Sequence, residues 1–246
     1  MANWTDPRAT VSAPSSVGAR ADYDVGLRSY MLSVYNYMAS GVLLTGIVAL
    51  LFAPYARDVL INAQGTGMSG AGWLITLAPL AFVMVLSFGI NRLSTGTAQA
   101  LFWAFAVVMG LSMSTIFITY TGTSIAQTFF ATAAAFAGLS LWGYTTKRDL
   151  WGFGTFLIMG LVGILVAMLI NVFLQSSAMA FAISVIGVLL FAGLTAYDTQ
   201  RIKSMYAYVA GTDMMGKSVI MGALSLYLDF VNMFMFLLQL FGGRRD

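Results

Sequence analysis

Three residue types that commonly build functional sites are missing from this chain of 246 residues: cysteine, histidine and glutamate. Without cysteine there is neither a disulfide framework nor a thiolate metal site. Without histidine the chain lacks the usual pH switch and the commonest transition-metal ligand, so proton sensing falls to its nine aspartates. Charge is scarce as well, at 9% of residues against about 25% in ordinary soluble domains. This composition excludes the soluble class.

Apolar residues make up 59% of the chain, and its mean hydropathy is +0.85. Several apolar runs reach the ~20 residues that a helix needs to cross about 30 Å of hydrocarbon. The runs are continuous and do not alternate with polar residues, which favours helices over a β-barrel. We therefore predict an all-α polytopic membrane protein with seven transmembrane helices, at residues 29–53, 73–90, 98–120, 125–145, 153–175, 178–199 and 221–241.

The polar segments predict the domain organisation and the orientation. Residues 1–28 are polar and carry balanced charges, which predicts a disordered or surface-lying leader before a single transmembrane domain at 29–246. With the amino terminus in the cytoplasm, nine of the twelve basic residues lie on the cytoplasmic side, in accord with the positive-inside rule. The carboxyl terminus would then lie outside. Arg244 and Arg245 would instead lie inside if the last apolar segment re-entered the membrane without crossing it.

Two aspartates, Asp198 and Asp229, lie in the last two apolar segments. An ionised carboxylate at membrane depth is costly, so such residues occur mainly where they pair, line water or bind a cation. At ~1.5 Å rise per residue, both lie within roughly 12 Å of the inner interface. Arg92, at the inner end of the second span, has a stem long enough to reach toward them. These three residues are the predicted functional site.

Polar neighbours support this assignment. Ser225 and Asn232 share a helix face with Asp229, and Thr195 stands one turn before Asp198. We include Tyr197 in the same supporting polar face. Such a face must point inward or at water.

Simpler roles stay open for two of the charged residues. Asp198 could be an interfacial charge paired with Arg201 at i+3, which would contribute a few tenths of a kcal/mol. Arg92 could be only a positive-inside anchor.

Residues 193–242 closely resemble the Bax inhibitor motif family of membrane proteins, in particular its bacterial members. The resemblance is specific in the run from Gly193 to Lys203 (GLTAYDTQRIK), in the run from Ala223 to Phe234 (ALSLYLDFVNMF) and in the terminal LLQLFG. It extends more loosely to the whole chain from about residue 28. It implies a seven-helix bundle with the last helix at its centre, and a cytoprotective role linked to calcium leak across a membrane.

The resemblance also implies roles for the three charged residues. In bacterial members an aspartate on each of the last two helices forms a pH sensor, with an arginine of the second span as partner. These roles map onto Asp198, Asp229 and Arg92, the arginine by its position alone. Two carboxylates ~4 Å apart repel by about 4 kcal/mol at an effective dielectric near 20, so the pair should share a proton. With the Asn232 oxygen, the pair could also form a weak, transient calcium site.

Two function classes other than a channel are an intramembrane aspartyl protease and a non-transporting regulator. Intramembrane aspartyl proteases also place a Tyr-Asp pair on one helix, as Tyr197 and Asp198 do here, but they carry glycines before the second aspartate, where this chain has Leu226, Tyr227 and Leu228. We therefore expect no enzyme. A non-transporting regulator that binds a membrane partner, such as a membrane-anchored protease, is the alternative. The prediction is a pH-sensitive calcium leak channel of a bacterial inner membrane, with calcium as the transported ion, no cofactor and no nucleic-acid partner.

The predicted orientation can be tested because the chain has no cysteine. A single cysteine at Lys147 should react only with a membrane-impermeant reagent that reaches the cytoplasm, and one at Gly243 only from outside. Labelling of both positions in intact and in permeabilised cells gives the answer. Cytoplasmic labelling at Gly243 would show that the last segment does not cross.

Overall fold

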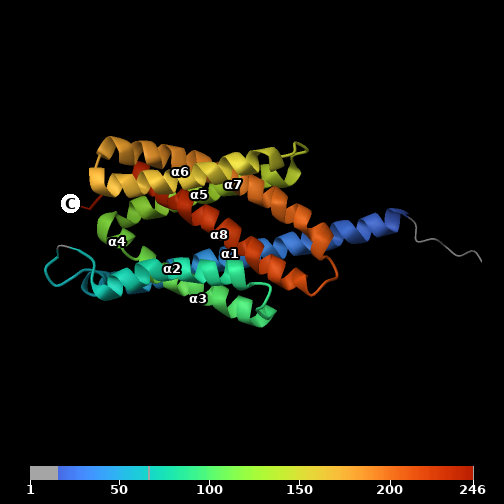
Figure 1. Cartoon of the computed structure of the whole chain (residues 1–246), viewed down its shortest axis with the longest axis horizontal. Coiled ribbons are helices and arrows are strands. Elements are labelled where there is room, and N and C mark those ends of the chain that lie inside the picture. The colour runs from blue at the N-terminus through green and yellow to red at the C-terminus, as the bar shows by residue number, and fades with distance from the viewer. Residues whose placement is uncertain (1–15, 66, 246) are drawn as a thin grey trace, which may run out of the picture.

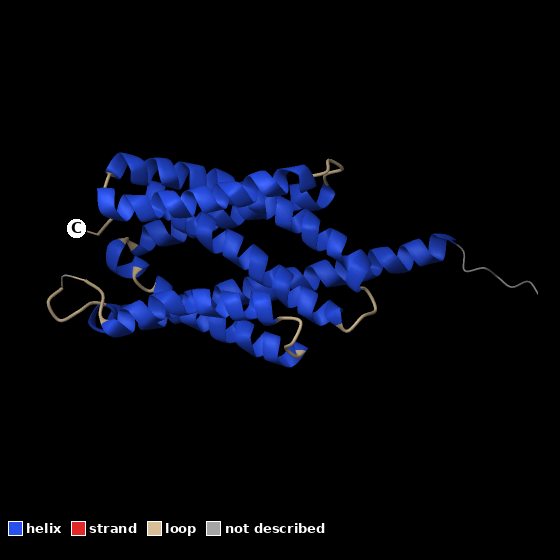
Figure 2. Cartoon of the chain, viewed as in Figure 1, coloured by secondary structure: helices blue, strands red, loops and turns tan. Residues whose placement is uncertain are grey.

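The structure is a computed structural model that describes residues 16–65 and 67–245, with side chains described from Ala21 onward. In this part of the chain all regular structure is helical (Figures 1 and 2). Seven spans are long and apolar enough to cross a membrane, with α3 and α4 forming one of them. This confirms the predicted all-α polytopic class. The helices are α1 Ser16–Leu60, α2 Gly70–Gly89, α3 Thr95–Met113, α4 Ile116–Thr119, α5 Gly122–Thr145, α6 Trp151–Leu174, α7 Ser177–Val209 and α8 Met214–Phe241.

Two groups of three long helices enclose α8. Helices α1, α2 and α3 pack together on one side, and α5, α6 and α7 pack together on the other (Figure 1). Helix α8 runs between the groups and contacts α1, α3, α5 and α7. In its most apolar 18-residue window 72% of the residues are buried inside the protein, against 11 to 39% for the other spans. The last helix is therefore central, as the family resemblance implied.

Short polar breaks between the apolar runs supply the residues that begin the helices. Ser69, Ser94, Thr121 and Ser176 are N-caps, and each side-chain oxygen accepts a hydrogen bond from the backbone N–H three residues later, at 2.9 to 3.3 Å. Such caps satisfy backbone donors that have no partner within the helix. The first residues of α2, α3, α5 and α7 therefore follow from local sequence.

Three helices extend beyond the predicted spans on one side of the bundle. Helix α1 already begins at Ser16, so it includes residues 16–28 of the expected leader, and residues 1–15 lie outside the described part. Helix α7 continues to Val209 where we expected an end near 199, and α8 begins at Met214 where we expected 221. The turn between them contains Gly211, with φ of +73°. Polar residues end a hydrophobic run but need not end a helix, so these helices are longer than the spans predicted from hydrophobic runs.

The final segment is one uninterrupted helix. The 28 residues of α8 span about 42 Å at ~1.5 Å per residue, which is enough to cross a bilayer. After Phe241 the tail is bound to the first turn of α5 and the end of α4: the backbone N–H of Gly243 donates to Ser124 Oγ at 2.7 Å, and that of Arg245 donates to the carbonyl of Thr119 at 2.9 Å. Helix α8 is therefore long enough for a full crossing, as we predicted, and the carboxyl-terminal end of the chain lies at the end of the bundle opposite the α7–α8 turn (Figure 1).

Helices α5 and α7 approach closely at one glycine. A Cβ placed on Gly143 would lie 2.9 Å from Ala196 Cα and would also meet the carbonyl of that residue. One turn earlier on α5, Ser140 and Thr199 form a hydrogen bond of 3.1 Å between their hydroxyls. Gly138, on the same helix, has open space around it. The close packing of α5 on α7 therefore depends on Gly143 and not on Gly138.

Gly143→Ala should lower the free energy of unfolding by about 1–3 kcal/mol, because the new methyl group overpacks against backbone atoms that cannot move aside. Gly138→Ala is the matched control and should raise it by about 0.5–1 kcal/mol, since alanine is the better helix former. Thermal unfolding in one detergent measures both. Equal effects of the two substitutions would show that the α5–α7 contact is looser than the structure indicates.

Candidate functional site

Helices α7 and α8 form the most extensive helix pair of the structure and carry the two aspartates. They run antiparallel and are joined by the short turn at residues 210–213. Asp198 lies eleven residues before the end of α7, and Asp229 lies fifteen residues after the start of α8. The turn therefore brings the two aspartates to similar heights on neighbouring helices, and Asp229 lies nearer the middle of its helix than we expected.

Asp229 is buried in the centre of the bundle. The residue is 4% exposed, and its Oδ2 atom has no hydrogen-bond partner among the described residues. Large apolar side chains precede and follow it, Leu228 and Phe230 among them. A carboxylate in such surroundings is stable only with a proton, a cation or water beside it. The packing of the described residues therefore leaves one carboxylate oxygen of Asp229 without a partner.

Asp198 lies at the wall of a small cavity of about 110 Å³. Its side chain is 14% exposed, and its Oδ1 lies 4.0 Å from Nη1 of Arg201, one turn further along α7. Asp198 is also close enough to Asp229 for the two carboxylates to repel each other electrostatically. The structure therefore brings together the two predicted aspartates.

The cavity is also lined by a residue that the sequence did not single out. Tyr30 of α1 is 1% exposed, and its hydroxyl forms a hydrogen bond of 2.7 Å with Ser218 Oγ of α8. Both residues line the cavity beside Asp198. No local pattern singles out Tyr30 among the eleven tyrosines, because its role comes from the packing of α1 against α7 and α8.

The residues of the predicted polar face do not all lie at the cavity. Ser225 lines the cavity together with Asp198. Thr195 Oγ1 donates to the Phe191 carbonyl at 2.7 Å, and Asn232 Nδ2 donates to the Leu228 carbonyl at 2.8 Å, so both bond to their own helices.

Tyr197 points away from the aspartates. Its ring contacts that of Trp151 at a centroid distance of 6.3 Å, and a Cβ on Gly154 would lie 2.6 Å from its hydroxyl. Tyr197 therefore packs against α6, which separates it from the supporting face to which we assigned it.

Arg92 lies in the turn between α2 and α3, exposed to solvent. Its backbone N–H donates to the Gly89 carbonyl at 2.8 Å, but its guanidinium forms no ion pair within the described residues. Helix α2 packs on α1 and α3. The basic partner of Asp198 here is Arg201, the alternative that the i+3 spacing left open, and a gating role for Arg92 stays a prediction.

The acidic residues of the site number two, Asp198 and Asp229. Among the described residues no group of three or more aspartates, glutamates, histidines or cysteines could hold a metal ion. Tight calcium sites use six to eight oxygens, so any calcium at this pair would complete its shell largely with water, hydroxyl or backbone oxygens.

Comparison with known proteins adds to this geometry. Residues 27–246 match the family described as "Inhibitor of apoptosis-promoting Bax1". Protein RP147 of Rickettsia prowazekii is 47% identical over 225 residues, which cover 91% of this chain and 93% of the relative. A Caulobacter vibrioides protein is 47% identical over 236 residues, covering 92% and 94% of the two chains. Inner membrane protein YbhL of Escherichia coli is 47% identical over 223 residues, covering 89% and 94%.

Proposed function

This chain belongs to the Bax inhibitor-1 family of membrane proteins, and we propose that it is a pH-sensitive calcium leak channel of a bacterial inner membrane, gated by Asp198 and Asp229. The observation that carries the proposal is the buried Oδ2 of Asp229, which lacks a hydrogen-bond partner within the described residues and lies near a second carboxylate. The name of the Escherichia coli relative, inner membrane protein YbhL, supports the assignment to an inner membrane.

The pair supplies a proton switch because two nearby carboxylates in a medium of low polarity cannot easily both be ionised. Gain and loss of the shared proton belong to the pair, not to either residue. Ionised, the pair attracts the Arg201 guanidinium and any cation that enters the cavity. Protonated, it loses that attraction. Acidification should therefore loosen the contacts that close the cavity and open the path.

Calcium would pass this point as a weakly held ion. Carboxylate oxygens are the ligands that calcium prefers, and the Ser225 hydroxyl lies on the same cavity wall as Asp198. Asn232 uses its amide nitrogen in a bond to Leu228, which leaves its amide oxygen as a possible acceptor. A site with so few protein ligands binds calcium transiently, as conduction requires.

The closing contact has two basic candidates. Arg201 lies 4.0 Å from Asp198, whereas Arg92 lies in the exposed α2–α3 turn. We propose that Arg201 is the cation released when the pair is protonated. Arg92 keeps the role implied by the family resemblance as a second hypothesis, in which it would hold α2 against α7 and α8.

Asp198→Asn and Asp229→Asn should each flatten the pH dependence of calcium flux in liposomes that contain the purified protein. The double variant should add little to either, since the two residues share one proton. Asp149→Asn, at an exposed loop position, is the matched control and should keep the wild-type profile. Independent, additive effects would contradict the shared proton. Folded wild-type protein without flux at any pH would favour the non-transporting regulator.

Removal of the closing arginine should raise calcium flux at neutral and mildly alkaline pH, because the closed state loses a charge-assisted contact. Arg201→Ala and Arg92→Ala, compared in the same liposomes, decide between the two candidates. The Asp198–Arg201 pair, at 4.0 Å and half-exposed, contributes up to about 1 kcal/mol, so its loss would change the open population up to about fivefold. A water-shielded Arg92 contact of about 1.5–3 kcal/mol would change it roughly tenfold or more. If only Arg92→Ala leaks, Arg201 is a structural partner of Asp198. If neither does, protonation acts on another contact.

A further inference from the structure

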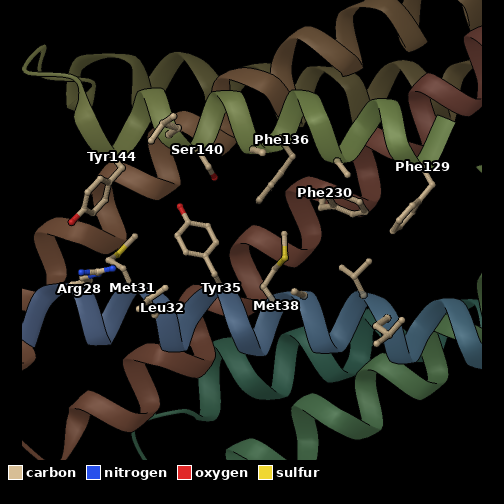
Figure 3. A pocket seen from close by; sticks show the side chains of 16 residues that line it. Arg28, Met31, Leu32, Tyr35, Met38, Phe129, Phe136, Ser140, Tyr144 and Phe230 are labelled. Carbon is tan, nitrogen blue, oxygen red and sulfur yellow. The ribbon is translucent and has the colours of Figure 1, made fainter. Parts of the chain in front are cut away.

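An apolar groove runs between α1 and α5 on the side of the bundle, with α8 as its floor (Figure 3). Its volume is about 710 Å³. We call it the α1–α5 groove. Side chains from the facing surfaces of the two helices form its walls, and one aromatic side chain of α8 forms its floor: Met31, Tyr35 and Met38, then Phe129 and Phe136, and Phe230.

The groove follows the long axis of the bundle. From Arg28 to Val42, both of which line it, α1 rises about 21 Å, which exceeds the roughly 15 Å of hydrocarbon in one leaflet. A second cavity of about 390 Å³ continues it toward the other end of the bundle, and the two share Val42, Leu43, Phe129 and Phe230. The groove is therefore long and narrow in the direction in which lipid chains lie.

The surroundings of the groove restrict what can fill it. Its lining is almost entirely apolar, so water would find few hydrogen-bond partners there. An empty groove of this size would cost the lining its dispersion contacts. The groove is open toward the outside of the bundle, where hydrocarbon surrounds transmembrane helices. A flexible hydrocarbon chain satisfies these conditions.

One end of the groove is charged. Arg28 lines that end, is exposed, and forms no ion pair within the described residues. Tyr144 lines the same end from the last turn of α5, two residues after the exposed Trp142 and three before Lys147. Tryptophan and lysine at a helix end mark the level of lipid headgroups. Arg28 therefore lies at headgroup level, and its guanidinium is suited to bind a phosphate with two hydrogen bonds.

We propose that the α1–α5 groove binds a membrane phospholipid, with one acyl chain along Met38 and Phe136 and the phosphate at Arg28. The charge at one end and the apolar lining beyond it match the two parts of such a ligand. Phe230, at the floor, follows Asp229 directly in α8, so a bound chain contacts the helix that carries the buried aspartate. The lipid site itself does not depend on calcium flux.

Native mass spectrometry of the detergent-solubilised protein, titrated with palmitoyl-oleoyl phosphatidylglycerol, tests the proposal. Ala133→Phe fills the groove, and Arg28→Gln removes the phosphate ligand. Each should lower the affinity for the first bound lipid about tenfold. The matched controls are Ala134→Phe, on the lipid-exposed side of α5 outside the groove, and Arg57→Gln, at the other end of α1. Both should bind lipid as the wild type does. Equal binding by all four variants would overturn the proposal.

A crosslinking measurement in native membranes covers the case in which Ala133→Phe does not fold. Ala137→Cys places the only thiol of the chain in the groove, and a photoreactive label on it reports the occupant. An adduct with the mass of one phospholipid, weakened by Arg28→Gln, supports the proposal. An adduct of protein size would show that a partner helix fills the groove and would overturn it.

Discussion

The burial of one carboxylate, Asp229, in the middle of a membrane helix is the constraint on which the rest of this structure depends. A charge at this depth cannot face lipid without a large free-energy cost. Helix α8 must therefore be surrounded, and the two groups of three helices on either side of it provide that enclosure. The arrangement explains why α8 is by far the most buried span although α6, with higher hydropathy, is the least.

The enclosure also assembles the site from three helices that are distant in sequence. Helix α7 contributes Asp198 and its partner Arg201, α8 contributes Asp229 and Ser218, and α1 contributes Tyr30. The tyrosine closes the cavity on the side of α1 through its hydrogen bond of 2.7 Å to the serine. A change in the charge of the aspartate pair therefore acts where α1, α7 and α8 meet. Movement there would displace helices of both groups, because α1 belongs to one group and α7 to the other.

The enclosure is incomplete on one side. Between α1 and α5 the floor of the groove is α8 itself, which lines it through the buried Phe230. A lipid chain in this position would complete the packing around the central helix, so lipid and proton would act on neighbouring residues of one helix. In that case the membrane is part of the structure that surrounds Asp229, and the channel proposal and the lipid proposal meet at α8 while resting on different observations.

Composition and apolar run length determined the class of this protein and the number of its spans, and they singled out Asp198 and Asp229 as charges within apolar segments. This was possible because the free-energy cost of polar groups in hydrocarbon acts on each segment separately. Short capping motifs likewise determined where α2, α3, α5 and α7 begin. Local sequence could not determine that α1 and α7 continue past the predicted spans, because helix formation in polar segments depends on packing. The Asp198–Arg201 pair follows from its i+3 spacing within α7. The Tyr30 contact with Ser218 and the contact of Tyr197 with α6 depend on how helices distant in sequence lie against each other. Only the tertiary structure decided these contacts, since each requires a specific approach of two side chains that no single segment encodes.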